Sequence, residues 1–135
     1  MNAHRELNEL LAKLKPQLLD GPFVFCTLDE QAMPAASNLQ PRASVMEPEG
    51  LSVVLTEAQA RDLGLPYEGV FRCITLTVQS SLEAVGLTAA VATALADDGI
   101  AANVIAGRHH DHLLVPQAQA SEAMQTLRRL SASVR

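Results

Sequence analysis

The chain has 135 residues, of which 48% are hydrophobic and 19% charged, and its formal net charge is −5 at pH 7. This size and make-up fit one compact domain or two small units that share a core, and they argue against disorder and fibrous structure. The scattered basic residues and net negative charge would repel phosphate backbones, so nucleic acid is not expected as a partner.

The sequence also gives no sign of a membrane span, an export signal or a catalytic motif. Its apolar runs are interrupted every few residues, and Met1–Glu6 lacks the basic start and apolar block of a secretory signal. We therefore expect no membrane partner and a cytoplasmic location. Cys26 and Cys73 lie in strand-like runs without metal-binding spacing, which predicts buried free thiols. None of the common nucleotide, metalloprotease or hydrolase motifs occurs, so no catalytic residue and no cofactor are predicted.

The first half of the chain is predicted to hold a helix, three short strands and a second helix. Leucines spaced i, i+3, i+4, i+7 from Leu7 to Leu14 indicate the first helix, which turn formers from Pro16 to Pro22 end. Turn formers in residues 29–41 predict an exposed loop, and Thr56 is expected to cap the second helix, which ends near Gly64. The predicted strands are rich in β-branched or aromatic side chains and are Phe23–Leu28, Ala43–Met46 and Leu51–Leu55.

The second half is predicted to follow the order strand, helix, strand, strand, helix. Its first helix is expected to start at a cap on Ser80 or Ser81, with Glu83 in the first turn, and to end at Gly99. Leucine and valine at helical spacing form its expected buried stripe, at Leu87, Val91 and Leu95. The remaining elements are expected at Val70–Val78, Ile100–Ala106, Asp111–Val115 and Gln119–Ser131.

The helix and strand in the middle of this half resemble the signature of the ACT domain. At Gly86–Asn103 the sequence is GLTAAVATALADDGIAAN, with apolar residues one, five and nine positions after the glycine. The stretches VQSSLEAVGLTAAV and NVIAGRHHDHLLVP, with FVFCTL and EPEGLSVVLTEAQA upstream, are similar to small bacterial proteins with two ACT-like halves. The C-terminal half is similar to that of ACT-type arginine sensors. A difference is Val85, where regulatory ACT domains often have proline.

The resemblance implies an α+β protein, a ferredoxin-like α/β sandwich in which two ACT-like halves, residues 1–68 and 69–135, have antiparallel sheets. It implies a regulatory module without catalytic machinery that binds a small effector. The sequence after the last helix is too short for a fourth strand. We expect the other half or a second subunit to cover that edge, because open edges pair uncontrollably, and we expect a homodimer.

The resemblance also implies where a ligand, usually an amino acid, would bind. The matching loop positions in this chain are Ser80, Ser81, Leu82, Val85, Gly86 and Leu87. A helix N-terminus attracts a carboxylate, and a glycine lets the ligand approach the backbone. Valine at position 86 is therefore expected to block a ligand and leave the fold intact. On the residues alone, Ser81 could instead be only a cap and Gly86 only a packing contact.

Three of the four histidines lie in RHHDHLLVP, from Arg108 to Pro116. If Asp111 begins a strand, His109 and His110 occupy the hairpin turn, and His112 lies on the opposite strand face from Asp111. His110 and His112 have a spacing that suits two metal ligands, but a closed zinc site needs four. The resemblance gives Asp111 the task of holding the cationic end of a zwitterion, beside His109 and His110. A solvated turn is the remaining interpretation.

Three functions are therefore weighed. The first is a sensor that binds an amino acid or a similar small zwitterion. The second is a metal- or histidine-dependent enzyme that uses His109, His110, Asp111 and His112. The third is an assembly module without a ligand.

Overall fold

The computed structural model describes residues 3–134. Met1, Asn2 and Arg135 lie outside the described residues. The prediction that Met1–Glu6 is not a secretory signal therefore falls partly outside the described residues. The chain forms two compact units: a central unit, residues Gly21–Phe71, and a composite unit, in which residues up to Asp20 pack with those from Arg72 onward. No helix in the described range combines the length and the apolar character that crossing a membrane requires.

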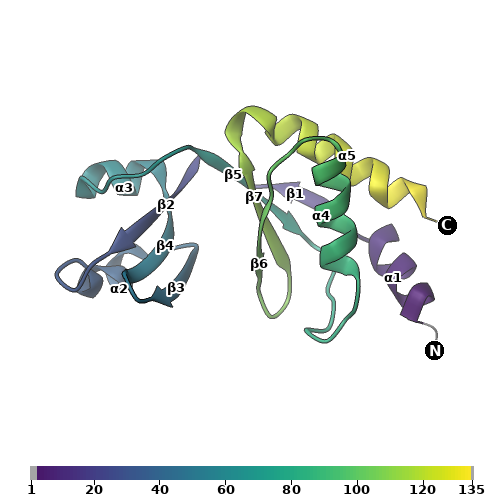
Figure 1. The fold of residues 1–135 in the computed structure, drawn as a ribbon, viewed down its shortest axis with the longest axis horizontal. Coiled ribbons are helices and arrows are strands. Elements are labelled where there is room, and N and C mark those ends of the chain that lie inside the picture. The colour runs from purple at the N-terminus through teal and green to yellow at the C-terminus, as the bar shows by residue number, and fades with distance from the viewer. Residues whose placement is uncertain (1–2, 135) are drawn as a thin grey trace. The chain divides into compact units, whose positions relative to one another are not determined.

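The central unit is an antiparallel sheet with short helices (Figure 1). Its three strands, in the order β3-β4-β2, are β3 (Ala43–Glu47), β4 (Gly50–Thr56) and β2 (Phe23–Leu28). Its helical segments are η1 (Met33–Ala35), α2 (Ala36–Leu39) and α3 (Glu57–Leu63). Its core is formed by side chains from β2, β4 and α3: Val24, Cys26, Leu28, Val53, Leu55 and Ala60. Burial raises the pKa of the Cys26 thiol, which favours the unreactive protonated form.

The strands and the second helix predicted for this unit are confirmed. Thr56 Oγ1 accepts a hydrogen bond from the Gln59 backbone N–H, and the Gln59 side chain accepts one from Thr56 N–H, which forms a complete capping box. The prediction of an exposed loop at residues 29–41 is wrong in part, because η1 and α2 form there. The Gln59 amide donates to the Leu39 carbonyl at 2.7 Å, and Leu39 packs on the core, so tertiary contacts order this segment.

The composite unit is a ferredoxin-like sandwich. Its sheet order is β1-β5-β7-β6, where the strands are β1 (Pro16–Leu18), β5 (Phe71–Leu76), β6 (Asn103–Ala106) and β7 (Asp111–Pro116). Its helical segments are α1 (Ala3–Ala12), α4 (Leu87–Asp97), η2 (Gln117–Gln119) and α5 (Ala120–Ser133). Helices α4 and α5 pack together and share the core with strands of the sheet (Figure 1). The predicted fold class is confirmed.

The fourth strand of this sheet comes from the N-terminal part of the same chain. Strand β1 pairs antiparallel with β5, so that Pro16 lies opposite Leu76 and Leu18 opposite Ile74. The Leu19 backbone N–H donates to the Cys73 carbonyl at 2.9 Å, which extends the pairing by one residue. The expectation that the other half of the chain covers the open edge is therefore confirmed.

Pro16 was predicted to lie in a turn, and this is wrong, because it begins β1. The chain turns one residue earlier, at Lys15, which adopts the left-handed conformation with φ +43°. The first position of a strand tolerates proline, which has no N–H to donate to a neighbour. A run of three residues is too short to show the alternation by which a strand is predicted.

The start predicted for α4 is also wrong. Ser80 and Ser81 do not cap the helix, and Glu83 is not in its first turn, because α4 begins at Leu87. Ser81 Oγ accepts a hydrogen bond from the Glu83 backbone N–H at 3.0 Å, a local turn that competes with helix formation. The predicted end is confirmed, since Gly99 has φ +73° and its N–H donates to the Ala96 carbonyl.

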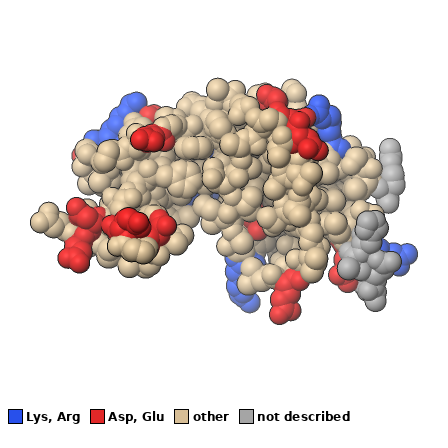
Figure 2. Space-filling model, in the orientation of Figure 1, with Lys and Arg blue, Asp and Glu red and all other residues tan. Residues whose placement is uncertain are grey.

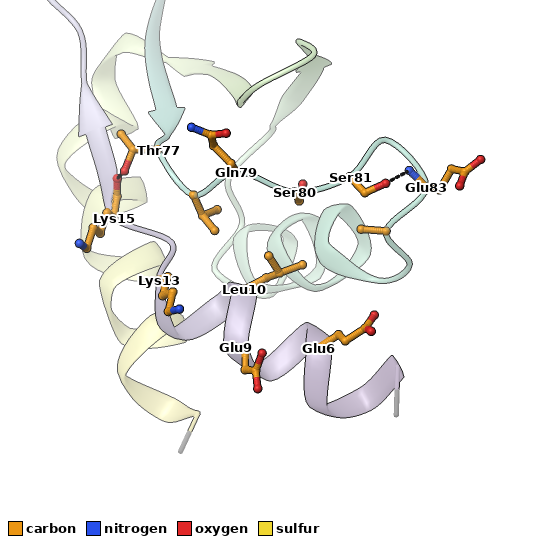
Figure 3. A pocket seen from close by; sticks show the side chains of 12 residues that line it. Glu6, Glu9, Leu10, Lys13, Lys15, Thr77, Gln79, Ser80, Ser81 and Glu83 are labelled. Atoms are coloured by element: carbon orange, nitrogen blue, oxygen red, sulfur yellow. Dashed lines mark hydrogen bonds between the residues drawn. The ribbon is translucent and has the colours of Figure 1, made fainter. Parts of the chain in front are cut away.

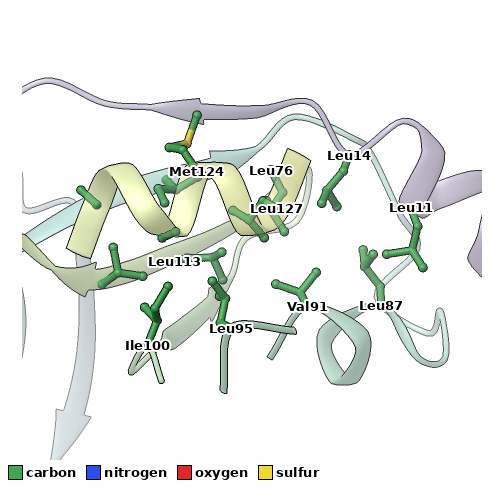
Figure 4. Packing of buried hydrophobic residues seen from close by; sticks show 14 residues of the cluster. Leu11, Leu14, Leu76, Leu87, Val91, Leu95, Ile100, Leu113, Met124 and Leu127 are labelled. Carbon is green, nitrogen blue, oxygen red and sulfur yellow. The ribbon is translucent and has the colours of Figure 1, made fainter. Parts of the chain in front are cut away.

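Buried leucines from α1, α4, α5 and the sheet meet in one core (Figure 4). The stripe predicted on α4, made of Leu87, Val91 and Leu95, is buried in this core. Leu11 and Leu14 from the N-terminal segment also belong to it, beside Leu87 and Leu76 (Figure 4). The N-terminal segment therefore contributes both a strand and part of the core to the composite unit.

Replacing Leu14 by alanine should lower the free energy of unfolding by about 2 to 5 kcal/mol, because Leu14 is 0% exposed and its loss leaves a cavity. Leu82→Ala is the matched control, because Leu82 is 71% exposed, and it should cost less than about 0.5 kcal/mol. Urea unfolding of both variants measures this. Equal costs for the two variants would show that α1 and β1 do not belong to the core.

Candidate ligand-binding site

The loop between β5 and α4 and the turn between β6 and β7 enclose a small cavity of about 80 Å³ in the composite unit. Seven of the nine residues predicted to bind a ligand line this cavity. They come from both segments and are Ser80, Ser81, Leu82, Leu87, His109, His110 and Asp111. We call this the loop cavity. The prediction that these residues bind a ligand stays a prediction, but the fold brings them together.

The other two predicted residues do not line the loop cavity. The Val85 side chain is 78% exposed. Gly86 precedes α4 with φ +101°, and a Cβ atom added there would approach Leu7 Cδ2 of α1 at 3.0 Å. The expectation that valine at position 86 would leave the fold intact is therefore wrong, because a β-branched residue is strained at this φ and would crowd α1.

The N-terminus of α4 faces the loop cavity through Leu87 and Thr88. The first hydrogen bond of the helix runs from the Ala90 N–H to the Gly86 carbonyl at 2.9 Å. The N–H groups of the residues before Ala90 have no partner within the helix and carry the positive end of its dipole. A carboxylate is the group that such a helix end favours.

Asp111 and His110 supply the polar groups on the opposite side. Asp111 begins β7 opposite Ala106, is half-buried, and makes no side-chain hydrogen bond or ion pair with any residue between positions 3 and 134. His110 Nδ1 is buried and lacks a hydrogen-bond partner within the same range. A half-buried carboxylate and an unsatisfied ring nitrogen are groups that a polar ligand would satisfy.

His112, the last histidine of the RHHDHLLVP stretch, does not line the loop cavity. His112 Nδ1 is 2.9 Å from Thr75 Oγ1, which joins β7 to β5. Within the described part of the chain, no group of three or more His, Cys, Asp or Glu side chains is placed to hold a metal ion. The absence of a metal and of a catalytic histidine stays a prediction.

Charge is distributed unevenly over the surface in Figure 2. Acidic side chains gather over the part of the central unit that contains α2, β3 and β4, whereas Lys and Arg side chains stand apart from one another on this face (Figure 2). Figure 2 shows one face of the molecule, so the absence of nucleic acid as a partner stays a prediction.

Four cavity residues were missed from the sequence: Ala84, Thr88, Ala106 and Gly107. Ala106 could have been found, because the register of a β6-β7 hairpin places it opposite Asp111, and opposite residues share a sheet face. Thr88 and Ala84 gave no signal, since the helix was predicted to start several residues too early.

The composite unit thus combines a ferredoxin-like sheet with a polar cavity at the N-terminus of α4. Residues 2–72 and residues 68–129 each match the ACT domain. The chain belongs to the ACT domain family, of which it carries two domains in tandem, and the resemblance noted from the sequence is confirmed. The division at residue 68 stays a prediction.

Solved structures show the same fold. A protein of unknown function from Vibrio cholerae, described as a possible transport protein, is 45% identical, with 96% of this chain and 99% of that chain covered and a TM-score of 0.86. A protein from Agrobacterium tumefaciens is 19% identical, with 86% and 87% covered and a TM-score of 0.71. The regulatory subunit of aspartate kinase from Thermus flavus is 8% identical, with 85% and 95% covered and a TM-score of 0.59. None of the curated proteins matches the sequence.

The cost of a side chain at Gly86 can be separated into backbone strain and contact with α1. Gly86→Ala and Gly99→Ala should each lower the free energy of unfolding by about 1 to 2 kcal/mol, because both glycines have positive φ. Gly86→Ala should cost more, since a Cβ at Gly99 meets nothing within 4 Å, whereas one at Gly86 meets Leu7. Urea unfolding with and without Leu7→Ala tests this. An unchanged difference in the Leu7→Ala background would contradict it.

Proposed function

We propose that the chain is a non-catalytic regulatory protein that binds an amino acid in the loop cavity. The observation that carries this proposal is that Asp111, His110 and the N-terminus of α4 line one cavity. Asp111 provides a negative charge for an ammonium group, and the helix end provides a positive potential for a carboxylate. The two charges of a zwitterion would thus each have a partner of opposite sign.

The size of the cavity supports a small polar head group as the part of the ligand that is enclosed. A volume of about 80 Å³ equals two to three water molecules at about 30 Å³ each. This accommodates the ammonium and carboxylate end of an amino acid, and a larger side chain would extend toward Leu82, which is exposed at the rim.

Structural neighbours support a regulatory role. The neighbours include regulatory subunits of aspartate kinase, and aspartokinase III of E. coli was solved with aspartate and ADP. That enzyme is 13% identical to this chain, with 85% of this chain and 32% of the enzyme covered and a TM-score of 0.64. We further propose that the protein acts in the cytoplasm and that neither nucleic acid nor a membrane is its partner.

The proposal is tested by a thermal-shift screen against the twenty common amino acids, followed by calorimetry. A ligand at 100 times its dissociation constant should stabilise the protein by about 2.7 kcal/mol. Asp111→Asn should weaken binding by about 1.5 to 3 kcal/mol, the size of a hydrogen bond to a charged group. If no amino acid binds the parent protein at millimolar concentration, the hypothesis of an assembly module without a ligand replaces this proposal.

Ala106→Val supplies an independent steric test. The residue lines the cavity and belongs to β6, where a β-branched side chain is favoured, so the variant should fold normally while its added methyl groups fill the cavity. Amino-acid binding should be lost without a loss of stability. Retained binding in both Ala106→Val and Asp111→Asn would place the ligand elsewhere.

We also propose a homodimer. Strand β3 is the outer strand of the central sheet, and Val45 and Met46 on it are exposed. An exposed apolar edge strand is a surface on which a second copy can pair. Light scattering should give twice the chain mass, and a mass of 14.4 kDa at micromolar concentration would contradict the dimer.

A further inference from the structure

A second, larger cleft of about 760 Å³ lies between α1 and the loop after β5 (Figure 3). We call it the α1 cleft. It shares Ser80, Ser81 and Ala84 with the loop cavity but includes neither Asp111 nor any histidine among its lining residues. Its volume falls in the range of about 300 to 1,000 Å³ that is usual for sites of small-molecule ligands.

Opposite charges stand at opposite ends of the α1 cleft (Figure 3). Lys13 and Lys15 lie at the end where α1 passes into β1, whereas Glu6 and Glu83 lie at the other end (Figure 3). None of these four side chains forms an ion pair within the part of the chain that the structure describes. Glu9 also lines the cleft, lies on α1 between these ends four positions before Lys13, and forms no ion pair in the same part of the chain. The cleft therefore offers a dipolar ligand one basic end and one acidic end.

Lys15 is held in a conformation that lysine rarely adopts. Its φ of +43° is in the left-handed region, where a residue with a Cβ is strained. Thr77 stabilises this conformation, because its Oγ1 donates to the Lys15 carbonyl at 2.9 Å. Glycine would adopt the same turn without strain. The turn places the Lys15 side chain among the residues that line the cleft.

Neutral polar groups line the wall between the charged ends. Gln79 and Ser80 belong to this wall, and their side chains make no hydrogen bond to any residue in the range 3–134. Leu10 of α1 lies on the other wall (Figure 3). Unused amide and hydroxyl groups between two charged ends suit a ligand with amide groups between its charges.

From these features we infer that the α1 cleft binds the free termini of a short peptide of about three residues. Glu6 lies on α1 and Lys13 directly follows its last residue, Ala12, so at about 1.5 Å per residue the helix from Glu6 to Ala12 accounts for about 9 Å of their separation. An extended tripeptide spans about the same length, at about 3.4 Å per residue. Its carboxylate would lie at Lys13 and Lys15, and its ammonium group at Glu6 and Glu83.

The probe is trialanine, measured by calorimetry on the whole chain against N-acetyl-trialanine and trialanine amide. Each blocked peptide should bind about tenfold or more weakly, because each loses one charged hydrogen bond. Binding of the blocked peptides as tightly as trialanine would overturn the inference, and so would tighter binding of a single basic amino acid than of trialanine.

Charge-neutral variants assign each terminus. In Lys13→Gln the preference for the free carboxylate over the amide should fall toward onefold, while the preference for the free ammonium group remains. Glu6→Gln should show the reverse. Arg128→Gln and Glu122→Gln on α5 are the matched controls, since both residues are exposed and outside the cleft, and both should keep the two preferences.

Lys15→Gly separates binding from folding. It should raise the thermal midpoint, because glycine relieves the strain of the left-handed turn, and it should weaken trialanine binding about tenfold. Parent-like affinity in this variant would overturn the role of Lys15. If an amino acid binds the parent protein and trialanine does not, the peptide inference fails while the proposed function stands. The opposite result leaves the peptide site and removes the amino-acid sensor.

Discussion

The pairing of β1 with β5 is the interaction on which the composite unit depends. A ferredoxin-like sheet needs four strands, and the described residues after β7 form η2 and α5 and no strand. Residues Pro16–Leu18 therefore complete the sheet from the other end of the chain. This pairing places Leu14 in the core and sets α1 beside the loop after β5. Both the stability of the unit and the α1 cleft follow from one short edge strand.

The same pairing explains why Gly86 is a structural residue as well as a neighbour of the loop cavity. With α1 in place, the space beside Gly86 is taken by Leu7, so only glycine fits the left-handed turn before α4. The turn ends the β5-α4 loop, and the first two residues of α4, Leu87 and Thr88, line the cavity. The glycine of the family signature thus positions the helix end, and its lack of a side chain serves packing against α1.

Periodicity predicted α1 and α5, because each buries one regular face, and β-branched or aromatic composition predicted the strands of the central unit. Sequence patterns failed where an element is too short to show a pattern and where a local side-chain hydrogen bond decides the backbone conformation. Strand β1 has only three residues and no alternation, and Ser81 with Glu83 resembles a helix cap, although Ser81 closes a turn. The sequence predicted which segments meet at the loop cavity better than it predicted the helix start, because hairpin register alone places Asp111 beside the turn. Ala84 and Thr88 depended on the true start of α4 and could not be predicted.

The two units share a sheet-and-helix plan but differ in the loop that follows β5 in the composite unit and β2 in the central unit. In the composite unit that loop leads to α4, which has 11 residues, so its N-terminus carries a full dipole. In the central unit it leads to α2, which has four residues. There the Asp29 carboxylate accepts a hydrogen bond from the Ala32 N–H at 2.9 Å, so this carboxylate already has a hydrogen-bond partner within the loop. Among the described residues, the composite unit therefore has both features that the proposed amino-acid site requires, a carboxylate without a hydrogen-bond partner and the N-terminus of a long helix in one cavity.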